Sequence, residues 1–80
     1  MRIIEAVAKR LLSLLEEKQM TQYALCKKVA LDPSNIYNIC YGRCKTMTID
    51  KLYLIAEGLD MTLQEFLDNP LFDKDNLVVD

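Results

Sequence analysis

The side chains with the clearest chemical potential lie in a short polar segment, residues 32–42. An asparagine amide donates and accepts at the same time, so it can form a bidentate pair with the edge of adenine, and a serine hydroxyl can do either. At about 100° per residue of an α-helix, three of the segment's side chains share one face and two others flank it. These residues are Ser34, Asn38 and Tyr41 on the face and Asn35 and Tyr37 on its flanks. A helix that carries this row is chemically able to read base edges in the major groove.

Strong start and stop signals frame the segment as a helix. Asp32 is a favourable N-cap residue, and Pro33 suits the first helical position, where no intrahelical N–H bond is needed. Gly42 accepts the left-handed conformation that closes a helix. The predicted helix covers residues 33–41, and its opposite, apolar face carries Ile36, Ile39 and Cys40.

A second short helix is predicted immediately before this one. Thr21 is its N-cap, and Leu25, Cys26 and Val29 lie on one face of about two turns. Only a tight connection separates the two helices, so they can share one hydrophobic seam. Two short helices joined in this way are typical of a helix-turn-helix motif.

Flanking segments predict the helices that must hold this pair in place. Apolar residues recur at helical spacing over residues 2–18, which indicates an amphipathic first helix. Thr48 caps a fourth helix after a basic loop at residues 43–47. The side of the fourth helix predicted to be buried carries Ile49, Leu52, Ile55, Ala56 and Leu59.

A fifth helix is predicted from the capping box formed by Thr62 and Glu65, and it should end before Pro70. Its apolar residues are Leu63, Phe66 and Leu67. The chain is therefore expected to be all-α, with one compact five-helix domain at residues 1–70. The remaining residues, 71–80, form a C-terminal tail that packs on the domain or serves in dimerisation.

The run from Thr21 to Gly42, with the loop and helices that follow up to Leu67, resembles the lambda-repressor and Cro-like (Xre-type) family of regulators. The resemblance implies a lambda-repressor-like DNA-binding domain whose second and third helices form the helix-turn-helix. Together with the helix geometry, it assigns base contacts to Pro33, Ser34, Asn35, Tyr37 and Asn38. It assigns contacts with the DNA backbone to Gln22, Tyr41, Arg43 and Lys45.

The sequence departs from the family pattern at several positions. Ala30 stands where the family has a turn glycine, and a positive φ there would strain it by roughly 1 to 2 kcal/mol. Cys26 replaces a small alanine, Gly58 lies inside the fourth helix, and Asp60 takes the left-handed C-cap position. The recognition helix holds no arginine, which argues against guanine-directed readout.

The charged residues are distributed unevenly along the chain. The net charge is −2, but residues 1–47 hold eight basic and four acidic side chains, whereas residues 48–80 hold two basic and eight acidic ones. This asymmetry, +4 against −6, is compatible with a basic face toward DNA and an acidic face turned away.

Enzymatic and metal-dependent functions are not expected. The chain has no histidine to activate a cysteine nucleophile and no glycine-rich phosphate loop, so no catalytic residue, cofactor or small-molecule ligand is assigned. Cys26, Cys40 and Cys44 lack the paired spacing of a zinc site, and we expect the first two to fill core gaps and the third to be more exposed. Without an apolar stretch of about 18 residues, the expected location is the cytoplasm rather than a membrane.

The predicted partner is double-stranded DNA, bound by a homodimer that acts as a small transcriptional repressor. The apolar remainder of the fifth helix and the tail from Leu71 to Val79 are the expected dimer contacts. The alternative is a protein-interaction module on the same fold, an antitoxin-like or anti-repressor protein whose acidic C-terminal half binds another protein. Salt-sensitive binding to duplex DNA separates the two.

Overall fold

In the computed structural model, which describes residues 1–78, the chain forms helices and no strand, so the prediction of an all-α fold is confirmed. Five α-helices are followed by two short 3₁₀ helices. In chain order they are α1 (Ile3–Glu17), α2 (Gln22–Lys28), α3 (Pro33–Cys40), α4 (Ile49–Gly58), α5 (Leu63–Leu67), η1 (Pro70–Phe72) and η2 (Lys74–Asn76).

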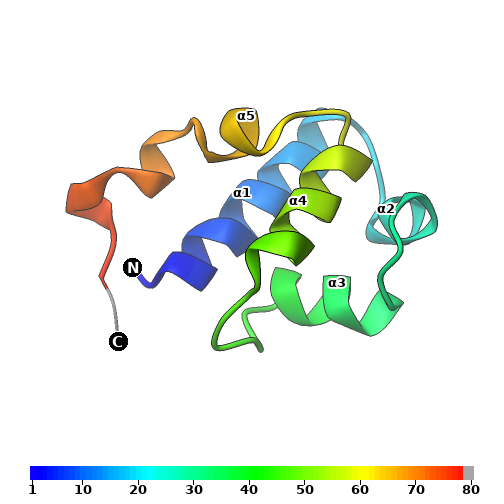
Figure 1. Ribbon diagram of the computed structural model, residues 1–80, viewed down its shortest axis with the longest axis horizontal. Helices are drawn as coiled ribbons and strands as arrows, with labels where there is room; N and C mark the ends of the chain where they lie inside the picture. The colour runs from blue at the N-terminus through cyan, green and yellow to red at the C-terminus, as the bar shows by residue number, and fades with distance from the viewer. Residues whose placement is uncertain (79–80) are drawn as a thin grey trace.

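The helices pack around α1, which crosses the middle of the molecule (Figure 1). Helix α3 contacts α1, and α2 contacts both α3 and α4, so the two short helices are held from behind by the longer ones. Helix α5 packs on α4 at the far side from α3. No helix among residues 1–78 is long and apolar enough to cross a membrane.

A single hydrophobic core joins all five α-helices. Its largest fully buried side chains are Leu11, Leu25, Ile36, Ile55, Leu59 and Phe66, and no polar or charged residue among those described is buried with them. Burying such a side chain contributes about 1.5 to 3 kcal/mol of hydrophobic stabilisation. The short helices α2 and α3 therefore take their positions from the core rather than from their own helix propensity.

Three of the four predicted N-caps form side-chain hydrogen bonds, whereas Asp32 stands at the N-cap position of α3 without one. The hydroxyl of Thr21 accepts a hydrogen bond from the Ala24 N–H at 3.0 Å, and that of Thr48 accepts one from Lys51 at 3.2 Å. Thr62 and Glu65 exchange the two bonds of a capping box, at 3.0 and 2.9 Å. The backbone N–H of Thr62, with its hydroxyl, holds the pKa of the Glu65 carboxyl below its usual value.

The expected strain at Ala30 does not occur. Helix α2 ends at Val29, whose extended backbone, φ −112° and ψ 153°, turns the chain toward α3 without a left-handed residue. Among the described residues other than glycine, only Gln19 and Asp60 have positive φ, and Gly42 has φ 67° as predicted. The missing turn glycine is therefore explained by a different turn geometry.

Two apolar residues near helix ends are exposed, and one of them, Ile49, was predicted to be buried. Ile49 is 67% exposed, because it lies in the first turn of α4 at the edge of the arc that Leu52, Ile55 and Leu59 bury. Leu67 is 37% exposed, whereas Phe66 is buried and Leu63 packs against the core.

The segment after α5 folds back along the domain. Phe72 packs against the core, with its ring centroid 6.3 Å from that of Phe66. The Val78 N–H donates to the Met1 carbonyl at 2.9 Å, and Val78 forms an isolated parallel bridge with Arg2. Residues 79 and 80, which belong to the predicted tail, lie outside the described residues.

The close approach of α2 and α4 at Gly58 leads to a stability prediction. A Cβ at this glycine would lie 2.9 Å from Leu25 Cδ1 and closer still to Val29 Cγ1. We expect Gly58→Ala to lower the free energy of unfolding by about 1 to 2 kcal/mol, because overpacking exceeds the roughly 1 kcal/mol gained in helix propensity. Urea denaturation measures this change.

The Val29→Ala variant provides the control, because it removes the methyl group that a new Cβ would meet. The double variant should lose less stability than the two single variants together. Additive losses would place the cause elsewhere than in this contact.

Candidate nucleic-acid interface

The outer face of α3 presents the residues that the sequence analysis selected. Pro33 and Ser34 are exposed in its first turn, Tyr37 is 44% exposed and Tyr41, its C-cap, is 57% exposed. The buried face packs through Ile36, Ile39 and Cys40, which confirms the predicted seam. The helix therefore exposes a mixed row of hydroxyl, amide and aromatic groups.

The two asparagines of this helix differ in what they already bind. Asn35 Oδ1 accepts a hydrogen bond from Lys51 Nζ at 3.3 Å, which ties α3 to α4. The side chain of Asn38 makes no hydrogen bond within residues 1–78, so its amide is available to a ligand. Its backbone carbonyl accepts a hydrogen bond from the Arg43 N–H at 2.9 Å, where the chain turns back after α3. Asn38 is half-buried rather than fully outward as predicted.

Aromatic rings pack together at the C-terminal end of α3. The rings of Tyr37 and Tyr41 lie 4.5 Å apart between centroids at an angle of 42°. The guanidinium of Arg43 lies over the Tyr37 ring, 5.2 Å from its centroid, at a distance that allows a cation–π interaction. The cation of Arg43 is therefore held beside the outer face of α3.

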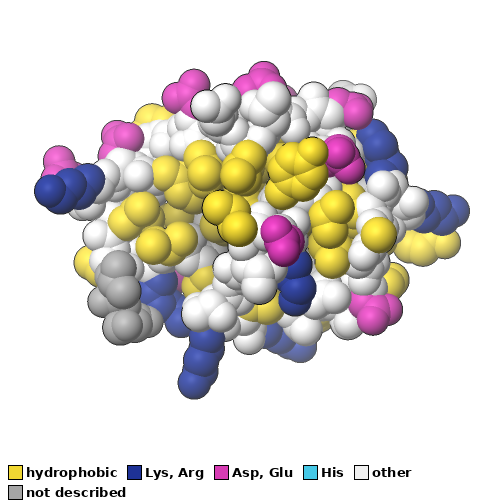
Figure 2. All heavy atoms as spheres, viewed as in Figure 1, with side chains coloured by type: hydrophobic (Ala, Val, Ile, Leu, Met, Phe, Trp, Pro, Cys, Tyr) yellow, Lys and Arg dark blue, Asp and Glu magenta, His cyan; other side chains and the backbone are white. Residues whose placement is uncertain are grey.

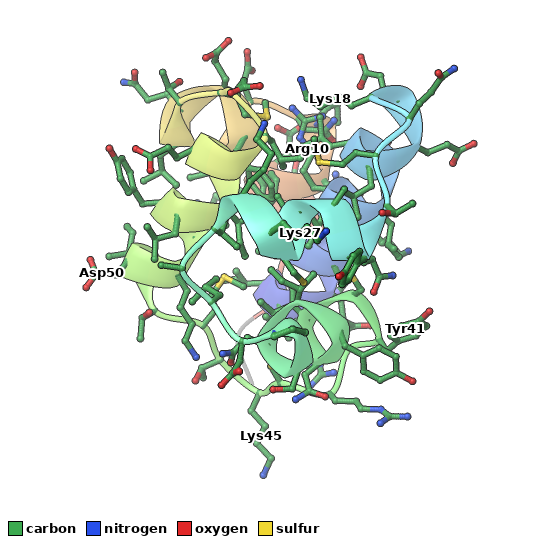
Figure 3. All side chains as sticks on the ribbon, turned by 90° about the vertical axis from the view of Figure 1, so that its right-hand side faces the viewer. Arg10, Lys18, Lys27, Tyr41, Lys45 and Asp50 are labelled. Carbon is green, nitrogen blue, oxygen red and sulfur yellow. The ribbon has the colours of Figure 1, made fainter. Side chains whose placement is uncertain are left out.

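Other cations surround the helix-turn-helix (Figure 3). Lys45 projects from the loop below α3, away from the body of the molecule. Lys27 points outward from α2, and its ammonium lies 4.7 Å from the centroid of the Tyr23 ring. Lys27 and Lys51 were not selected from the sequence, because only the packing of α2 and α4 beside α3 brings them to this surface.

Two other basic residues, Arg10 and Lys28, bind groups on distant helices and turns of the protein itself. Arg10 donates to the carbonyls of Phe66 and Glu65 at 2.8 and 3.0 Å, so it ties α1 to α5. Lys28 forms an ion pair with Asp60 at 3.2 Å. In Figure 2, acidic side chains lie along the edge formed by α5, whereas Lys and Arg side chains gather along the opposite edge, near α3.

The three cysteines lie in the hydrophobic core or pack against it. Burial raises the pKa of the Cys40 thiol to about 11, so it is protonated at neutral pH and is a poor nucleophile. Cys26 and Cys44 are both half-buried, and both pack against the core. Within residues 1–78, no three potential metal-ligating side chains come together.

Two short helices on a shared seam, with a polar outer face and adjacent cations, define a helix-turn-helix DNA-binding domain. A family model described as the Cro/C1-type HTH DNA-binding domain matches residues 10–70, and the chain belongs to that family. This match confirms the resemblance found in the sequence. No curated protein and no solved structure matched the chain.

The position of the loop cations generates a prediction about salt dependence. Replacing Arg43 and Lys45 together by alanine should weaken binding to every duplex and make the slope of log K against log salt shallower by roughly two units, about one per lost phosphate contact. Fluorescence anisotropy at several salt concentrations measures the slope.

The matched control replaces Lys9 and Lys18, two exposed lysines of α1 and its C-cap, by alanine. That variant has the same loss of charge but should keep the parental slope. Equal changes in both variants would mean that net charge, rather than the loop, sets the slope.

Proposed function

We propose that the protein is a transcriptional regulator that binds double-stranded DNA sequence-specifically, with α3 and its C-cap, residues 33–41, in the major groove. The observation that carries the proposal is the unpartnered amide of Asn38 on a helix surrounded by cations. A free amide can read the edge of a base, and neighbouring cations supply the attraction to phosphates that all duplexes share.

The exposed groups divide into two classes of contact. Residues near the start and along the outer face of α3 would contact bases, and these are Pro33, Ser34, Asn35, Tyr37 and Asn38. Residues at the ends of the two helices and in the loop would contact the DNA backbone, and these are Gln22, Tyr41, Arg43 and Lys45. Backbone contacts would set the register of the domain, and base contacts would set its specificity.

Repression is the regulatory role that needs the least beyond this surface. A protein bound across a promoter excludes the polymerase without any further contact. The expected location for this role is the cytoplasm. A reporter gene with the selected site placed across its promoter should lose expression when the protein is made. Increased expression would identify an activator.

Substitution of Asn38 tests base readout. We expect Asn38→Ala to lower affinity for the preferred duplex by about 1 to 3 kcal/mol and to relax selectivity at one base pair per half-site, with adenine as the preferred partner. Nonspecific binding should stay nearly unchanged, because the cations remain. Binding constants against all four base pairs at each half-site position, at one salt concentration, provide the measurement.

The control is Gln64→Ala, which removes an exposed amide from α5, far from α3. It should bind like the parent. A uniform loss with Asn38→Ala at every sequence would make this residue a backbone contact, and no loss at all would favour the protein-interaction alternative.

A homodimer on DNA is the second part of the proposal, because one short recognition helix reads only a few base pairs. Helix α5 offers one exposed large apolar side chain, Leu67, since Phe66 is buried and Leu63 packs on the core. A larger apolar hollow of about 700 Å³ lies between the start of α1, the start of α4 and the tail, which supports this face as the contact. Ile3, Ile49 and Val78 line it and are 50%, 67% and 56% exposed.

The hollow extends to the loop that carries Lys45, which is proposed to contact the DNA backbone. A second copy bound in the hollow would therefore lie close to the same DNA. Figure 2 shows hydrophobic side chains across the face that includes α4 and the segment after α5. In this arrangement the domain at residues 1–70 provides the DNA-binding surface, and the tail from residue 71 contributes to the dimer.

We expect Ile49→Glu to prevent dimer formation, because the interface would have to bury an unpaired carboxylate. Light scattering should show a monomer, and the affinity for a duplex with two half-sites should fall to that for one. Leu12→Glu, at a 42% exposed leucine on the other face of α1 from Ile3, is the control and should remain a dimer. A parent protein that is monomeric both free and on its best site would contradict the proposal.

A further inference from the structure

A shallow hollow of about 400 Å³ lies where α2 and α3 meet, among the residues proposed to contact DNA. It is distinct from the larger hollow at the start of α4. Its lining residues are Gln22, Tyr23 and Cys26 from α2 and Pro33, Ser34 and Tyr37 from α3.

The lining is mostly apolar, which is unusual for a surface that binds a polyanion. Proline has no N–H to donate, and the cysteine thiol is only a weak donor. Tyr23 and Tyr37 add two exposed aromatic side chains, 66% and 44% exposed. The hollow therefore offers its occupant more apolar contact than hydrogen bonding.

The hollow lies at the part of the helix-turn-helix that contacts base edges. Helix-turn-helix proteins contact base edges with the N-terminal residues of the recognition helix, and Pro33 and Ser34 are the first two residues of α3. Cations lie over both tyrosine rings, Lys27 at 4.7 Å from Tyr23 and Arg43 at 5.2 Å from Tyr37. Both tyrosines that line the hollow therefore carry a positive charge beside their rings, which favours a polyanion nearby.

We propose that this hollow receives the methyl-bearing edge of a thymine, and that Cys26 and Tyr37 determine specificity for it. Among the groups that base pairs present in the major groove, the thymine C5 methyl is the apolar one. The inference rests on the proposed function, since it requires α3 to lie in the major groove. It adds a thymine, read by shape and apolar contact, to the adenine read by the Asn38 amide.

The test uses the best duplex selected from a random pool, with each thymine replaced in turn by deoxyuridine. This change removes one methyl group and leaves every hydrogen-bonding group of the base in place. At one thymine per half-site we expect affinity to fall about fourfold, the change that burial of one methyl group supplies. The other thymines should tolerate the replacement.

Two variants connect that thymine to the hollow. In Cys26→Ser and in Tyr37→Ala, the ratio of affinities for the thymine and uracil duplexes should fall toward one at the sensitive position, whatever the overall affinity. Tyr53→Ala, at a 52% exposed tyrosine on α4, is the control and should keep the parental ratio. Thermal unfolding of each variant confirms that the folded protein is being compared.

The outcomes separate this inference from the proposed function. Tight, sequence-selective binding with no thymine sensitive to uracil would overturn the inference and leave the proposed function intact. A sensitive thymine whose ratio is unchanged in both hollow variants would assign the methyl contact to another part of the protein. Failure to enrich any duplex sequence would count against the proposed function itself.

Discussion

The packing of Leu25 and Ile36 into the core is the contact on which the DNA-binding surface depends. Both side chains are fully buried, and each belongs to a helix of no more than eight residues. Isolated helices of that length are not stable in water, so the direction in which α3 presents its outer face is set by the longer helices behind it. The recognition surface is therefore as rigid as the core that α1 and α4 provide.

The local signals in the sequence were sufficient to predict the five α-helices, but not the two short 3₁₀ helices that follow them. Caps at Thr21, Thr48 and Thr62 and the stop at Gly42 depend on neighbouring residues only, and each is present in the structure. Exposure at element ends depended on tertiary packing instead. Ile49 fits a buried pattern by spacing but lies at the edge of the contact.

The candidate interface was predictable in outline and less so in detail. The face of α3 followed from helical periodicity, whereas the engagement of Asn35 by Lys51 requires knowledge of how α4 lies beside α3. The same holds for the basic residues. Their number in the first half of the chain was visible in the sequence, but the structural roles of Arg10 and Lys28 appear only when their partners on distant helices are known.

The stack formed by Tyr41, Tyr37 and Arg43 has a consequence for the entropy of binding. A free arginine side chain loses rotamer freedom when it is fixed on a phosphate, and this ordering opposes association. Here the guanidinium already rests on an aromatic ring, which itself packs on a second ring. Part of the ordering has thus taken place during folding, so in the proposed complex the arginine would approach DNA with fewer conformations left to lose.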